Sequence, residues 1–367
     1  SSAGGTRYRM LELVRRFAGR RLVGADEEAT TVRAAATWFA GEVGPDRASD
    51  RTWVGRVAAD VETLRSLVER LTRLGTDDTV LAAELAATVT RYLEGVQAYR
   101  PAIEQAERWV GALAPSPARV ALLTQLATLH LRVDEVDPAQ PWAQQAAAER
   151  DRVGAPAWDE VGVERVRGEI ANRSGRPAEA VAVAQDALTR VSSARSRARM
   201  FNLLGIARIH LGDVEAAAAA FAQELDACHE LGDDLLTTRA EANAAELALR
   251  RGLAAEAAKH QRACLHLADA LGQPVFVAYS LSVAARLVRR TDESVAVRLL
   301  SKALQVLEET HHRLYADDEA HVRGMLAESL GRLGERAYGQ AQSAGRALRL
   351  DEAARLADTV LKQGAGR

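Results

Sequence analysis

Apolar residues recur along this chain at helical spacing, and short polar turns separate the helical stretches. The clearest turns hold Gly175, Gly212 and Gly252, which stand 37 and 40 residues apart. An apolar stretch of helix length precedes each glycine and another follows it. The pattern therefore predicts a repeat of helix, turn and second helix.

Small residues recur at two fixed offsets from the turn glycine. Seven residues before it stand Gly168, Gly205 and Ala245, and five after it stand Ala180, Ala217 and Ala257. Antiparallel helices approach closely only where side chains are small, so these positions predict where the helices of each pair cross.

The repeat continues less clearly on both sides. A fourth unit has Thr291 at its turn, with Ala284 before it and Ala296 after it. An upstream pair has a turn punctuated by prolines over residues 134–141, and a downstream pair has Gly334 at its turn. Residues 350–361 are predicted to close the stack, because a terminal repeat needs a polar outer face.

Composition agrees with an extended helical stack. The chain of 367 residues is 48% hydrophobic but only 4% aromatic, and residues that favour strands do not alternate with period two. We therefore predict an all-α fold, a right-handed superhelix of stacked antiparallel helix pairs over residues 117–367. A small helical region over residues 25–116 precedes it, and residues 1–24 are assigned to a linker or to the end of a preceding module.

Charge and targeting patterns narrow the functional class. The net charge is −2 and the pI is near 6.5, so we expect no direct binding of nucleic acid. The basic run of Arg195, Arg197 and Arg199 is interpreted as a solvated helix start. No stretch is long and apolar enough for a membrane span, and the N-terminus has no signal peptide, so we expect a cytoplasmic protein without membrane contact. Cys228 and Cys264 are expected to be buried thiols rather than a disulfide.

Catalytic chemistry finds little support in the sequence. Residues 311–321 concentrate His311, His312 and His321 with carboxylates, a set that suits a divalent metal or the capping of two helix ends. We favour capping, and keep a metal-dependent enzyme as an alternative. The chain has no Gly-x-Ser-x-Gly, His-Glu-x-x-His or Cys-x-x-Cys motif, so we predict no enzymatic activity, no metal and no cofactor.

The middle unit carries a family resemblance. Its Leu204-Gly205 pair, followed by Ala217 and Phe221, resembles the tetratricopeptide repeat, although Arg208 stands where that repeat usually has tyrosine. The resemblance implies that the first helix of each pair lines a concave groove. By offset from the turn, the inward positions are Arg165, Glu169, Asn172, Asn202, Ile206, His210, Arg239, Asn243, Glu246 and Arg250.

These ten residues are the candidate ligand-binding set. Amides, carboxylates and guanidinium groups on one wall suit a peptide backbone or an extended small molecule. Each side chain taken alone has a simpler explanation as a solvated helix residue. Arg165 with Glu169 and Glu246 with Arg250 are also spaced as i,i+4 salt bridges within a helix.

Several stretches before the repeats resemble a more specific family. They are residues 7–18 (RYRMLELVRRFA) followed by Arg21 and Leu22, residues 60–67 (DVETLRSL), residues 92–95 (YLEG) and residues 104–113 (EQAERWVGAL). They are similar to the helices that follow the winged-helix module in multidomain signal-transduction ATPases of the STAND or NB-ARC type, many of them bacterial transcriptional regulators. The chain lacks the Gly-x-x-x-x-Gly-Lys-Ser/Thr phosphate loop, so the resemblance implies a sensor region whose ATPase modules lie upstream in a longer parent protein.

The expected function is non-catalytic ligand sensing and protein interaction, with a peptide, protein or small-molecule inducer bound in the groove. Trp38, Trp53, Trp109, Trp142 and Trp158 are expected to be mostly core residues. An exposed Trp38 or Trp53 would instead suit contact with the upstream ATPase domains. The alternative is a free-standing tetratricopeptide scaffold that binds a partner protein.

Overall fold

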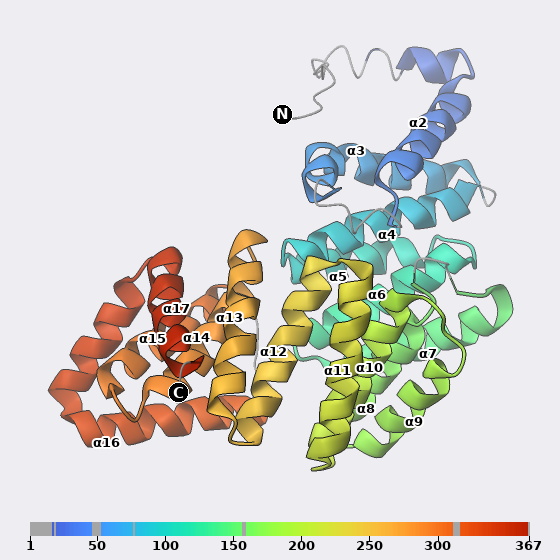
Figure 1. The fold of residues 1–367 in the computed structure, drawn as a ribbon. Helices are drawn as coiled ribbons and strands as arrows, with labels where there is room; N and C mark the ends of the chain where they lie inside the picture. The colour runs from blue at the N-terminus through green and yellow to red at the C-terminus, as the bar shows by residue number, and fades with distance from the viewer. Residues whose placement is uncertain are drawn as a thin grey trace. The chain divides into compact units, whose positions relative to one another are not determined.

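The computed structural model describes Phe17 and residues 20–45, 53–75, 78–155, 159–310 and 316–365. All regular structure among these residues is helical, which confirms the predicted all-α class (Figure 1). Their contacts define two compact units. The first holds the described residues up to Leu126 with residues 148–155, and the second holds residues 127–147 and the described residues from 159 onward.

The first unit contains α2 (Glu28–Val43), α3 (Trp53–Leu74), α4 (Thr79–Gly95) and α5 (Tyr99–Val110). One face of α3 buries Val57, Leu64 and Leu71, which stand two turns apart. Trp53 is buried at the start of α3, where its indole Nε1 donates to the backbone oxygen of Val43 at 2.9 Å. These contacts hold the beginning of α3 against the end of α2.

The helices α6 (Pro117–Arg132) and α7 (Val136–Val153) belong partly to each unit. At the start of α6, Arg119 donates through Nε to the backbone oxygen of Val110 at 3.1 Å and forms an ion pair with the buried Glu149. These bonds tie the first turn of α6 to the end of α5 and to α7. The boundary predicted at residue 117 marks the start of α6, whereas the division by contacts runs through α6 and α7.

Four antiparallel helix pairs form most of the second unit, stacked in chain order. They are α8 (Gly162–Arg173) with α9 (Pro177–Leu188), α10 (Ala194–His210) with α11 (Val214–Leu231), α12 (Asp234–Arg250) with α13 (Ala254–Ala270), and α14 (Pro274–Val288) with α15 (Glu293–Glu309). The stack of helix pairs is therefore as predicted, and its right-handed sense stays a prediction.

Left-handed backbone conformations end the first helix of three pairs. Gly175, Gly212 and Gly252 have φ angles of 71°, 75° and 74°, values that glycine adopts without a steric penalty. The fourth turn works differently, because Thr291 stands there and the next residue, Asp292, caps α15. The Asp292 carboxylate accepts a hydrogen bond from the amide of Val295 at 2.9 Å.

The two crossing glycines make room for different partners. A Cβ atom on Gly205 would lie 2.3 Å from Cε1 of Phe221, so this glycine lets α10 approach α11 within one pair, as predicted. A Cβ atom on Gly168 would instead lie 2.3 Å from Cδ2 of Leu203 on α10. Gly168 therefore opens space between successive pairs, and its assignment to the crossing of α8 with α9 is corrected.

The C-terminal helices close the second unit. The long helix α16 (Ala316–Ala347) is kinked at Gly334, whose φ and ψ are 75° and 159°. The last helix, α17 (Leu350–Ala365, red in Figure 1), packs against α13 and α14. The contact is close, because a Cβ atom on Gly364 would lie 3.2 Å from that of Ala258. Asp358 of α17 also accepts a hydrogen bond from Nε of Arg262 at 2.7 Å and lies 2.8 Å from Nε2 of His266.

Both cysteines are buried and free, as the sequence predicted. Burial is the main cause that raises the pKa of each thiol, Cys228 and Cys264, to about 12. Among the described helices, none combines the length and hydropathy that crossing a lipid bilayer requires.

Candidate ligand-binding face

The ten predicted binding residues lie on three consecutive first helices, α8, α10 and α12, and are called the polar face below. Arg165, Glu169 and Asn172 lie on α8. Asn202, Ile206 and His210 lie on α10, and Arg239, Asn243, Glu246 and Arg250 lie on α12. The structure divides them into two charged clusters and several residues with separate surroundings.

The first cluster surrounds Glu224, a fully buried carboxylate on α11. Arg239 donates to Oε1 of Glu224 through Nε at 3.3 Å and through Nη2 at 3.2 Å. The amides of Asn202 and Asn243 donate to Oε2 at 3.2 and 3.3 Å. Three polar-face residues from two different helices therefore converge on one internal acid.

Burial is the largest influence on Glu224. It raises the pKa of the carboxyl group above its usual value, while the charge of Arg239 and the hydrogen bonds from Asn202, Asn243 and Arg239 act in the opposite direction. The four donor atoms, which belong to three side chains, compensate the cost of burying the carboxylate. The same hydrogen bonds fix the rotamers of the three side chains. Part of the hydrogen-bonding capacity assigned to a ligand is thus used inside the protein.

The second cluster surrounds Glu169 on α8. Three guanidinium groups lie within 4 Å of its carboxylate: Nε of Arg173 at 3.6 Å, Nη1 of Arg165 at 3.7 Å and Nη1 of Arg132 at 3.8 Å. Burial acts to raise the pKa of Glu169, and the surrounding arginines outweigh it, so the pKa lies below its usual value. The predicted pair of Arg165 with Glu169 is present as part of this larger cluster.

The two clusters are electrostatically connected. The positive charge of Arg239 on α12 contributes to lowering the pKa of Glu169 on α8. It is the smallest of the influences on Glu169, after burial and the charges of Arg132, Arg173 and Arg165.

The other polar-face residues have separate surroundings. Glu246 pairs with Nε of Arg250 at 3.1 Å, the predicted i,i+4 bridge, and with Nη1 of Arg286 at 2.6 Å. Ile206 packs in the apolar cluster with Phe221, and His210 is exposed. Asn172 is buried, and its Oδ1 atom has no hydrogen-bond partner among the described residues.

Sequence reasoning missed the residues that organise these clusters. Glu224 stands three residues after Phe221 and four before Cys228, all on the buried side of α11. An acid among the apolar positions of a helix indicates a buried carboxylate that has hydrogen-bond partners. The spacing of Glu224 from Phe221 and Cys228 could therefore have predicted its burial. Arg132 and Thr128 on α6 were missed because the upstream pair does not follow the repeat clearly.

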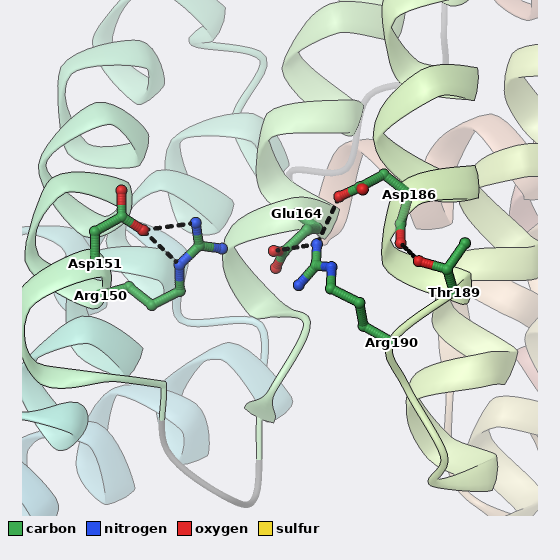
Figure 2. A network of polar contacts seen from close by, with 6 residues as sticks. All are labelled: Arg150, Asp151, Glu164, Asp186, Thr189 and Arg190. Atoms are coloured by element: carbon green, nitrogen blue, oxygen red, sulfur yellow. Dashed lines mark hydrogen bonds and ion pairs between the residues drawn. The ribbon is translucent and has the colours of Figure 1, made fainter.

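A further network joins α8 to the residues after α9 (Figure 2). Nη2 of Arg190 lies 2.7 Å from Oδ2 of Asp186 and 3.4 Å from Oε1 of Glu164. The hydrogen bond to Asp186 is the main cause that raises the pKa of Arg190. Thr189 donates through Oγ1 to the backbone oxygen of Asp186 at 2.7 Å, which closes the end of α9. The guanidinium group of Arg190 thus bridges a carboxylate on α8 and a carboxylate on α9.

The basic run at the start of α10 is neutralised by acids. Arg195 pairs with Asp233 at 3.0 Å, and Arg197 pairs with Glu230 at 2.5 Å. Arg199 forms an ion pair with Asp159. The three guanidinium groups are therefore engaged by protein carboxylates.

Of the proposed histidine cluster, His311 and His312 lie outside the described residues, and His321 lies on α16. Within the part of the chain that the structure describes, no group of three or more His, Cys, Asp or Glu side chains is placed to hold a metal ion.

The tryptophans separate into two groups. Trp38 is 59% exposed on α2, with its ring edge-to-face against Phe39 at a centroid distance of 4.8 Å. Trp53 and Trp109 are buried, and Trp142 is half-buried. Trp158 lies outside the described residues.

No protein-family model matches the sequence, and no curated protein matches it.

Proposed function

We propose that this chain is a non-catalytic sensing and interaction region that binds a peptide, a protein or a small-molecule inducer along the polar face. The observation that carries the proposal is the convergence of Asn202 on α10 with Arg239 and Asn243 on α12, because it brings polar side chains from two repeats to one region. Binding by several side chains from successive repeats is what a stack of helix pairs provides. The polar face carries both carboxylate and guanidinium groups, and such a surface favours a polar ligand over an apolar one.

A screen of peptides and metabolites by thermal shift tests the proposed binding. A ligand that prefers the folded state raises the melting temperature, and a hit is then titrated against two variants. Arg250→Ala removes an exposed guanidinium from the polar face, whereas Arg167→Ala removes an exposed guanidinium from another side of α8. We expect only Arg250→Ala to weaken binding. The proposal would be contradicted if no ligand is found, or if the ligands found bind Arg250→Ala as tightly as the wild type.

We further propose that the region serves a signal-transduction ATPase of the STAND or NB-ARC type, as a cytoplasmic regulator of transcription. The resemblance supports it at residues 60–67, within α3, and at 104–113, which begin in α5. Of residues 7–18, all but Phe17 lie outside the described residues. The exposed Trp38 adds support, because a sensor alters a switch domain only through contacts that differ between two states.

The parent reading frame provides the decisive test of this assignment. A phosphate loop encoded upstream would support the ATPase regulator, and a parent without one would favour the free-standing tetratricopeptide scaffold. In a parent with such a loop, Trp38→Ala should reduce the ligand response of ATP hydrolysis while ligand affinity is unchanged. An unchanged response would exclude Trp38 from the coupling contact.

A further inference from the structure

Arg165 has an unusual set of partners for a half-buried arginine. Its guanidinium group can donate five hydrogen bonds. Nη2 donates to the neutral hydroxyl of Thr128 at 2.9 Å. Among the described residues, the carboxylate paired with it is that of Glu169, 3.7 Å from Nη1, beyond normal hydrogen-bond distance.

The other arginines of the polar face are paired more directly. Arg239 donates twice to Glu224, at 3.2 and 3.3 Å, and Nε of Arg250 lies 3.1 Å from Glu246. Within the polar face, Arg165 is the arginine that lacks a carboxylate at hydrogen-bond distance. Its guanidinium group is therefore the least directly paired of the three.

Neighbouring charges reinforce this difference. Burial is the main cause that lowers the pKa of Arg165, and the positive charges of Arg199 and Arg132 act in the same direction. Asp159 and Glu169 oppose them without restoring the usual value. Asp159 has the largest charge effect on Arg165, and it is also the partner of Arg199 in an ion pair, so the two arginines share this acid. An added anion would relieve the repulsion among the three cations.

We propose that Arg165 binds an oxyanion of the ligand, a carboxylate or a phosphate group, with Arg132 and Arg199 flanking it. A planar guanidinium group matches the paired oxygens of both groups, and a partly desolvated setting strengthens each charge-assisted bond. The inference rests on the proposed binding function and narrows its ligand to molecules that carry such a group.

Titration with simple anions tests the site in the full chain. Inorganic phosphate and glutarate serve as probes, the ionic strength is held constant with sodium chloride, and melting temperature is the readout. We expect a saturable rise with at least one probe, and the more effective probe identifies the group. Arg165→Met should raise the half-saturating concentration at least tenfold. Arg165→Lys should have a smaller effect, because lysine keeps the positive charge and loses only the planar, paired N–H donors.

Two controls separate binding from structure. Arg167→Met, an exposed substitution on the same helix, should leave the half-saturating concentration unchanged. Without added anion, Arg165→Met should still unfold in one cooperative transition, so that a lost response to the anions reports the missing guanidinium group and not a loss of the fold.

The inference would be overturned by wild-type protein that shows no saturable response to either anion. Wild-type behaviour of both Arg165 variants would overturn it equally. If ligands found in the screen still depend on Arg250 in that case, the binding function stands and only the oxyanion site is lost.

Discussion

Arg239 donates two hydrogen bonds to Glu224, although the arginine side chain is 29% exposed on α12 and the glutamate side chain is fully buried on α11. The arginine thus reaches inward from the polar face to an acid between the helices. With Asn202 of α10 bound to the same carboxylate, three helices from two repeats share one polar centre.

Glu224→Ala should be strongly destabilising. It leaves one guanidinium group and two amides without their acceptor, and breaking such a set costs about 3 kcal/mol. Urea unfolding followed by circular dichroism measures the loss. Glu215→Ala is a matched control, because this acid lies exposed in the first turn of the same helix and should cost less than about 1 kcal/mol. Equal effects of the two substitutions would show that the buried centre contributes nothing special.

The raised pKa of Glu224 predicts how stability depends on pH. Between the usual and the raised pKa, the folded protein holds a proton that the unfolded chain has released, so stability falls as pH rises through this interval. We expect the free energy of unfolding of the wild type, relative to that of Glu224→Gln, to decrease from pH 4 to pH 7. The opposite trend would mean that Arg239 and the amides outweigh burial.

Asn202→Ala and Asn243→Ala should each cost about 1–2 kcal/mol, because each removes one donor to the same oxygen of Glu224. A double-mutant cycle in urea should show a coupling energy of at least about 0.5 kcal/mol, since residues in one hydrogen-bond network are not independent. Strict additivity would argue that the two amides act separately.

Gly205→Ala should destabilise the protein by about 1–3 kcal/mol, because the new methyl group would overlap the ring of Phe221. Ala217→Trp should overpack the same crossing at least as severely, since Ala217 is fully buried. Gly324→Ala is the control: no atom lies within 4 Å of its Cβ position, and alanine in a helix is favoured by about 1 kcal/mol. Thermal melts of the three variants report the difference directly. Wild-type stability of Gly205→Ala would overturn the assigned crossing.

Native Cys228 and Cys264 should resist thiol reagents at pH 8. Both are buried, and the pKa of each thiol is about 12, so little thiolate is present to react. Labelling with iodoacetamide, followed by intact-mass measurement, should give an unmodified protein without denaturant. In guanidinium chloride at about 6 M, which unfolds most domains, it should give two additions. Rapid labelling of the native chain would contradict the packing described for α11 and α13.

The repeat could be predicted from the sequence because it depends on local features. Gly212 ends a helix because its backbone can adopt a positive φ, and Gly205 allows another helix to approach closely. Both can be recognised in the sequence as small residues at fixed positions within the repeat. The role of Gly168 could not be obtained in this way, because the side chain that fills its space, Leu203, comes from the next pair.

The polar centres were harder to predict for a related reason. An offset from the turn places Asn202 and Asn243 on one side of their helices, and says nothing of whether each amide meets solvent or an internal acid. That outcome depends on Glu224, which stands on the intervening helix. Arg165 stays a prediction as a binding residue, and the charges of Arg132 and Arg199 that act on it come from other helices.

The return of α17 onto α13 and α14 alters how the end of the stack melts. In a linear array each repeat touches only its neighbours, and the last one frays at little cost. Here Asp358 is bonded to Arg262, 96 residues earlier. Unfolding of α17 exposes the surfaces of α13 and α14 that it covers, so the last two pairs should unfold together as one cooperative block and not one after the other.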